Sequence, residues 1–143
     1  MPTTVKEVRS STRIHAPIEV AWKALTTPAL IKRWFFGVDT ESDWKVGSQL
    51  VHRGVYQGKP YVDKGEILEF KPPRRLVHTH WSAGSCEPDR ADSYQVVQWD
   101  LAEEGGGTVL TVTEQNLPSD DAATTSERAW KGALGSLRDM LEH

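Results

Sequence analysis

Two histidines, His78 and His80, stand two residues apart in a stretch that is typical of a β-strand. Because side chains alternate across a strand, both imidazoles would lie on the same face of a sheet. Two imidazoles at this spacing can share a metal ion, polarise one carbonyl group or exchange a proton with a bound molecule. His52, on another predicted strand, is a third candidate for the same chemistry.

A metal site needs three or four ligands, which the two histidines alone do not supply. The loop that follows holds four more candidate ligands, Cys86, Glu87, Asp89 and Asp92. Their spacing fits no recognised ligand pattern, so we expect hydrogen-bonded strand histidines, no metal and no cofactor. Cys86 is the only cysteine and has acidic neighbours, which do not activate a thiol. The sequence also lacks a complete catalytic motif, and we assign no catalytic residue.

Six tryptophans are the unusual feature of the composition. Large aromatic side chains dominate the energetics of protein cores and of apolar ligand pockets, so the same residues fit both interpretations. The residues that we expect to line a ligand pocket are Trp34, Phe35, Trp44, His52, His78, His80, Trp99, Trp130, Leu134 and Leu137. The alternative is that the aromatic side chains simply fill the core.

The first part of the chain predicts one strand and two short helices. The strand covers Val5–His15, and Pro17 then favours a helix start because proline suits the first helical position. Apolar residues at spacings of four and three give this helix one buried face. Thr27 and Pro28 predict a second helix that ends near Trp34.

Short apolar runs separated by turn residues follow, which indicates a meander of antiparallel strands. The predicted strands are Gln49–Tyr56, Tyr61–Phe70, Leu76–Trp81, Ser93–Leu101 and Thr108–Thr113. A capping box from Thr124 to Glu127 predicts the start of a long final helix with one apolar face. Helices at the two ends of an antiparallel run imply an α+β domain, residues 1–143, with a curved six-stranded sheet around the final helix.

The composition limits the partners of this domain. The 143 residues carry a formal net charge of -3 with no basic run, so we expect no nucleic acid partner. No window approaches the roughly 20 apolar residues of a membrane span. The N-terminal residues lack the pattern of a secretory signal, and we expect a cytoplasmic protein.

The order of several motifs resembles the START-like (SRPBCC) superfamily, and within it the bacterial proteins similar to the C-terminal domain of the heat-shock-protein-90 ATPase activator. The segments that carry this resemblance are residues 14–26, 34–37, 44–47, 64–77, 107–113 and 130–134. The resemblance implies a helix-grip fold with an internal cavity. It does not identify a function, because one fold hosts many functions.

The stretch around the two histidines departs from the family pattern. Relatives often carry an aromatic or aliphatic residue near position 78 and a tryptophan near position 80. Either His78 and His80 bind a polar group of a ligand, or the strand is shifted so that Val77, Thr79 and Trp81 face inward.

Three functional hypotheses follow. The first is binding of a small, mostly apolar molecule, lipid-like or of polyketide or aromatic type, without covalent chemistry. The second is an enzyme of the cyclase or hydrolase type that uses His52, His78 or His80. The third is a protein-interaction module, although no segment shows an interface for a chaperone. The chain would be a monomer or a homodimer, since an exposed edge strand such as the first can pair two copies.

Overall fold

The computed structural model describes residues 6–83 and 87–142. Its elements are β1 (Lys6–Ile14), α1 (Ile18–Thr26), α2 (Pro28–Trp34), β2 (Asp39–Ser42), β3 (Gln49–Tyr56), β4 (Lys59–Lys71), β5 (Arg75–Ser82), a short 3-10 helix (Ala91–Ser93), β6 (Gln95–Glu104), β7 (Gly107–Leu117) and α3 (Asp120–Glu142). The α+β class, the curved antiparallel sheet and the long C-terminal helix are therefore confirmed. Cys86 and His143 lie outside the described residues.

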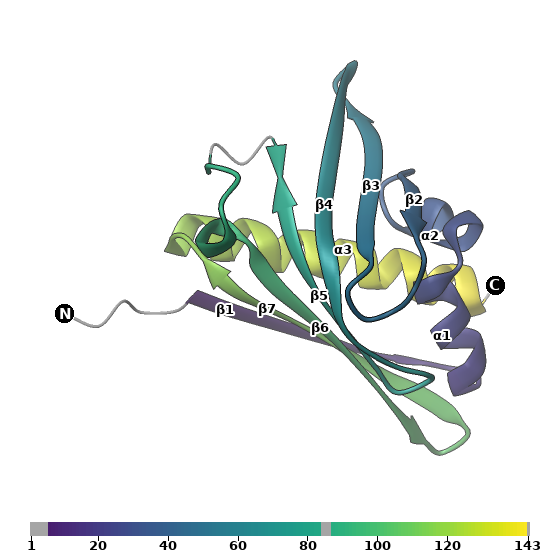
Figure 1. Cartoon of the computed structure of the whole chain (residues 1–143). Helices are drawn as coiled ribbons and strands as arrows, with labels where there is room; N and C mark the ends of the chain where they lie inside the picture. The colour runs from purple at the N-terminus through teal and green to yellow at the C-terminus, as the bar shows by residue number, and fades with distance from the viewer. Residues whose placement is uncertain (1–5, 84–86, 143) are drawn as a thin grey trace.

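The strands form one antiparallel sheet in the order β1-β7-β6-β5-β4-β3-β2 (Figure 1). It has seven strands, so the expected number of six was wrong. The extra strand, β2, has only four residues and a polar sequence, Asp-Thr-Glu-Ser, which gives no apolar signal. Its pairing with β3 holds it in place, so tertiary contacts and not local propensity make it a strand.

Curvature of the sheet comes partly from β4, where the pairing register with β5 shifts between Ile67 and Glu69. Such a bulge bends a strand and increases its twist. Gly65 lies just before it, and a Cβ atom there would collide with the carbonyl oxygen of Thr79. The close approach of β4 to β5 therefore requires a glycine.

The N-cap of helix α3 is Ser119, five residues before the Thr124 that the capping box predicted. The hydroxyl of Ser119 accepts a hydrogen bond from the backbone N–H of Ala122 at 3.0 Å, which is an N-cap contact. Thr124 is exposed in the second turn, and Ser126 donates its hydroxyl hydrogen to Glu114 instead of capping the helix. The prediction of the helix start was therefore wrong, because an earlier serine makes the cap.

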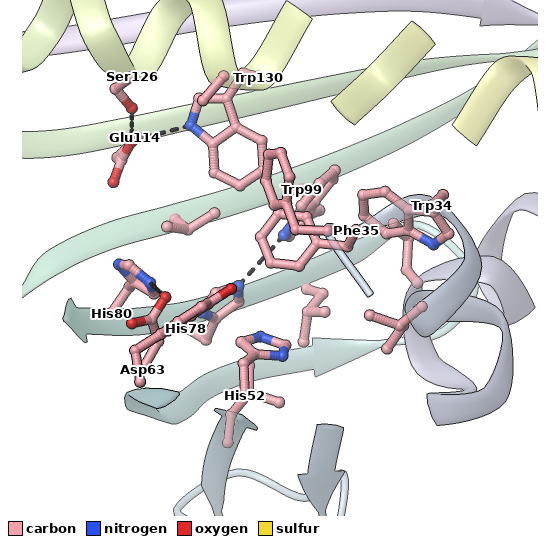
Figure 2. Close-up of a pocket in the computed structure, with 18 of the residues that line it drawn as sticks. Trp34, Phe35, His52, Asp63, His78, His80, Trp99, Glu114, Ser126 and Trp130 are labelled. Carbon is pink, nitrogen blue, oxygen red and sulfur yellow. Dashed lines mark hydrogen bonds and ion pairs between the residues drawn. The ribbon is translucent and has the colours of Figure 1, made fainter. Parts of the chain in front are cut away.

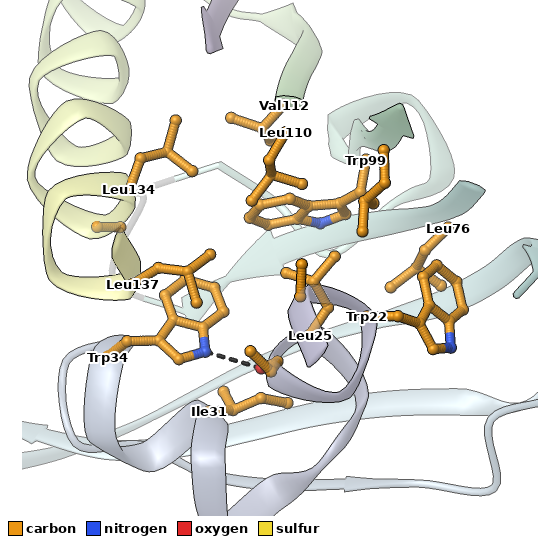
Figure 3. Close-up of a cluster of buried hydrophobic side chains, with 14 of the residues drawn as sticks. Trp22, Leu25, Ile31, Trp34, Leu76, Trp99, Leu110, Val112, Leu134 and Leu137 are labelled. Atoms are coloured by element: carbon orange, nitrogen blue, oxygen red, sulfur yellow. Dashed lines mark hydrogen bonds between the residues drawn. The ribbon is translucent and has the colours of Figure 1, made fainter. Parts of the chain in front are cut away.

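The core lies where α3 crosses the concave side of the sheet near α1 and α2 (Figures 1 and 3). Leu134 and Leu137 of α3 are fully or almost fully buried in it, together with Leu110 and Val112 of β7. Trp34 is anchored there, since its Nε1–H donates to the carbonyl oxygen of Ala24 at 2.8 Å. No helix in the described ranges is long and apolar enough to cross a membrane.

Two glycines of α3 are exposed on the side away from the sheet. A Cβ atom at Gly132 or Gly135 would meet nothing within 4 Å. We expect Gly132→Ala and Gly135→Ala each to raise the free energy of unfolding by about 1 kcal/mol, because alanine loses less backbone entropy in a helix. Urea unfolding measures this, and Gly65→Ala is the opposite control, expected to destabilise. A loss of stability in both helix variants would contradict the assignment of an open helix face.

Candidate functional site

A cavity of about 210 Å³ lies between the concave side of the sheet and the helices α2 and α3. Eight of the ten predicted pocket residues line it, namely Trp34, Phe35, Trp44, His52, His78, His80, Trp99 and Trp130. Leu134 and Leu137 are not among the lining residues, since both are buried in the core beside it. Phe36 and Ala129 line the cavity and are exposed, so the cavity reaches the surface between them.

Aromatic rings form the wall nearest the helices (Figure 2). The rings of Phe35 and Trp130 are stacked with centroids 6.0 Å apart. Trp99 meets both Trp130 and Trp34 edge to face, at 5.3 and 5.9 Å. Edge-to-face and offset contacts of this kind add stability beyond simple burial, so the wall is preformed.

His78 and His80 line this cavity. The alternative, a strand shifted so that Val77, Thr79 and Trp81 face inward, is therefore wrong. Thr79 and Trp81 point to the opposite side, where Trp81 stacks on Tyr94 with centroids 6.3 Å apart. The departure from the family pattern therefore adds two imidazoles to the interior.

Both ring nitrogens of His78 form hydrogen bonds. Its Nδ1 lies 2.9 Å from the carbonyl oxygen of Thr79, and its Nε2 accepts a hydrogen bond from Trp99 Nε1 at 3.3 Å. A carbonyl oxygen can only accept, so the proton is on Nδ1 and the ring is neutral. Burial lowers the pKa of His78 to about 3, with the hydrogen bond to Thr79 acting in the opposite direction. His78 is therefore a structural partner of Trp99 rather than a proton donor to a ligand.

His52 is also held as a neutral ring. Its Nδ1 shares a hydrogen bond of 2.8 Å with the hydroxyl of Thr40 on β2. Burial lowers the pKa of His52 to about 4, and the nearby charge of His80 acts in the same direction. The otherwise unexpected strand β2 thus fixes the orientation of one cavity histidine.

His80 differs from the other two histidines because it has a carboxylate partner. Its Nε2 lies 3.3 Å from Asp63 Oδ2. Burial alone would lower the pKa of His80, but the hydrogen bond and charge of Asp63, with the charge of Glu114, outweigh burial and raise this pKa. Burial also acts to raise the pKa of Asp63, but the hydrogen bond and charge of His80, together with a hydrogen bond from Ser82 and the charge of His52, outweigh burial and lower this pKa. Within the described chain, His80 Nδ1 is buried and makes no hydrogen bond of normal geometry, and the side chain of Gln95 lies close enough to help raise the pKa of His80.

Glu114 on β7 is a second buried carboxylate, on the side of the cavity nearest α3 (Figure 2). Its Oε1 accepts hydrogen bonds from Trp130 Nε1 at 2.9 Å and from Ser126 Oγ. An indole N–H can only donate, so this oxygen is an acceptor. The two donors also join α3 to the sheet.

Sequence reasoning missed Asp63, Glu114 and Ser126. Period-two counting along β4 from Tyr61 would have placed Asp63 on the inner face. Glu114 directly follows the predicted end of the last strand at Thr113, and β7 continues to Leu117. Ser126 was assigned to the capping box. In the parts of the chain that the structure describes, no three His, Cys, Asp or Glu side chains are placed to hold a metal ion.

Comparison with known proteins places this fold in a family. Residues 15–142 match the family described as activator of Hsp90 ATPase homolog 1-like protein. ChR145 from Cytophaga hutchinsonii is 37% identical, with a TM-score of 0.80 over 98% of this chain and 94% of that one. CalU16 from Micromonospora echinospora is 29% identical, with a TM-score of 0.71 over 92% and 73%. CV1439 from Chromobacterium violaceum is 19% identical, with a TM-score of 0.83 over 96% and 98%, and it shares the fold. No curated protein gives a significant match.

The neutral histidines make stability depend on pH. Unfolded histidines take up protons near pH 6.5, whereas His52 and His78, with pKa values of about 4 and about 3, stay neutral when folded. The unfolded state therefore binds more protons below pH 6.5, and the free energy of unfolding falls as pH falls. We expect a loss on the order of 2 kcal/mol per histidine between pH 7 and pH 5.

Urea unfolding at several pH values measures this loss. His52→Gln and His78→Gln should each reduce this loss by about 2 kcal/mol, because each removes one histidine that the fold holds neutral, while His80, whose raised pKa acts in the opposite direction, stays in both variants. The control His15→Gln changes an exposed histidine and should retain the pH dependence of the original chain. An unaltered slope in both cavity variants would show that these rings are not held neutral.

Proposed function

The chain belongs to the family of activator of Hsp90 ATPase homolog 1-like proteins, and we propose that it binds a compact, mostly apolar small molecule in the cavity between the sheet and α3. The observation that carries this proposal is the aromatic wall of Phe35, Trp99 and Trp130 facing a few polar side chains. Apolar walls with a small number of placed polar groups are the usual composition of ligand pockets.

The volume narrows the class of ligand. An apolar cavity of about 150 Å³ accommodates benzene, and pockets for drug-sized ligands occupy roughly 300–1,000 Å³. At about 210 Å³, this cavity suits a molecule of one or two rings. Of the two ligand types expected from the sequence, the volume favours an aromatic compound over a lipid-like one.

Direct binding tests this proposal. We expect naphthol and indole to bind with measurable heat in titration calorimetry, and long-chain fatty acids to bind more weakly. Ala129→Trp places a large side chain at the mouth of the cavity and should weaken binding at least about tenfold, or about 1.4 kcal/mol.

Ala102→Trp is the matched control, because Ala102 is an exposed residue of β6 outside the cavity lining. It should bind both compounds as the original chain does. Failure of every compact aromatic compound to bind, or equal binding by the Ala129→Trp variant, would reject a ligand site in this cavity.

The His80–Asp63 hydrogen bond favours a second candidate function, an enzyme of the cyclase or hydrolase type. Asp63 holds Nε2 of the imidazole, and the buried Nδ1 makes no hydrogen bond of normal geometry with a described residue, so it is available to exchange a proton with a bound molecule. Interaction with a chaperone rests on the family name alone, and we do not propose it for this chain.

Mass spectrometry of a ligand identified by calorimetry tests the enzyme function. If His80 exchanges protons with the ligand, the original chain should convert the ligand to a product of changed mass or retention time. The His80→Gln variant should bind the ligand but lose at least about 99% of that turnover, in line with the usual contribution of a general acid or base. Recovery of unchanged ligand from the original chain would exclude this function for that compound.

A further inference from the structure

The described residues that line the cavity carry more negative than positive charge. Two carboxylates, Asp63 and Glu114, line it together with three histidines, and no lysine or arginine is among the described residues of its lining. His52 and His78 stay neutral at physiological pH because burial lowers their pKa values to about 4 and about 3. His80 is the one imidazole with a carboxylate partner, and it can balance only one of the two negative charges.

Glu114 is the carboxylate that accepts no hydrogen bond from a charged group of the described residues; His80, whose pKa the charge of Glu114 helps to raise, is hydrogen-bonded to Asp63 instead. It is 6% exposed, and its Oε1 receives only the neutral donors Ser126 and Trp130. The structure gives no hydrogen bond from a described residue to its second oxygen, Oε2, which Figure 2 shows on the side away from Ser126 and Trp130. A buried carboxylate that is not hydrogen-bonded to a cation is costly, so this position favours a positive charge supplied from outside the chain.

The aromatic wall lies beside Glu114 in the same cavity lining. Trp130 donates its N–H to Glu114, and the ring of Trp130 contacts the rings of Phe35 and Trp99. Trp130 presents its N–H edge to Glu114, and this edge of the ring is positive, so an ammonium group there would be attracted by the carboxylate and not by this ring. The aromatic wall would hold the apolar ring of the ligand.

We propose that the cavity selects compact aromatic amines, with the ammonium group bound by Glu114 Oε2 and the ring held against Phe35, Trp99 and Trp130. The proposal rests on the proposed function, because it specifies which small molecule the cavity takes. It does not depend on the proton of His80, since the cavity has an excess of negative charge whether His80 is protonated or neutral.

Three ligands of equal size and different charge test this selection. Naphthylethylamine, naphthylethanol and naphthylacetate carry the same ring system with an ammonium, a hydroxyl or a carboxylate group. At pH 7.5 we expect calorimetry to show the amine binding at least about tenfold more tightly than the alcohol, and the carboxylate binding most weakly. In Glu114→Gln, the amine should bind no more tightly than the alcohol, whose own affinity should change by less than about twofold.

The substitution keeps the structural role of the side chain. A glutamine carbonyl oxygen still accepts hydrogen bonds from Ser126 and Trp130, so α3 should stay docked, and the thermal midpoint of unfolding checks this. Glu127→Gln is the matched control, since it removes an equal charge from the next residue after Ser126, in a surface pair with Lys131. It should retain the preference for the amine.

The outcomes separate the two proposals. If the alcohol or the carboxylate binds as tightly as the amine, or if Glu114→Gln retains the preference, amine selection is overturned and the ligand-binding function stands. If none of the three compounds binds, the binding function fails, and amine selection fails with it.

Discussion

The indole of Trp99 connects the two parts of the molecule that matter for function. Its ring packs edge to face on Trp34, which is anchored to α1 through the carbonyl oxygen of Ala24, and on Trp130 of α3. Its N–H is donated to His78 on the neighbouring strand. One side chain therefore fixes the distance between sheet and helices and the tautomer of a cavity histidine. The aromatic wall and the polar wall depend on this single residue.

The overall architecture could be predicted because its signals are local and repeated. The proline at the start of α1, the period of the apolar residues in α3 and the turns between strands each specify an element without help from the rest of the chain. Strand β2 and the start of α3 could not be read in this way. β2 is a strand only because β3 pairs with it. Ser119 caps α3 although the later sequence Thr124–Glu127 matches the capping-box pattern more closely.

The candidate site was only partly predictable for a related reason. The aromatic residues and histidines stand out by type, and the inner face of a strand follows from counting. The carboxylates do not stand out, because Asp and Glu are common and most are exposed. The role of Glu114 depends on Ser126 and Trp130, more than ten residues away on another element. Pairings of this kind need the folded structure.

Strand β2 has a consequence for how the molecule behaves among its own copies. An open sheet exposes unpaired backbone groups along its outermost strands, and these can recruit further chains into a growing ribbon. On this side the outermost strand is four residues long, and Asp39 and Glu41 pair with Lys32 and Arg53 on the surface. An edge strand that is so short and so charged offers few backbone hydrogen bonds to the strand of another chain. The segment that orients His52 thus also makes this edge of the sheet a poor site for pairing with another chain.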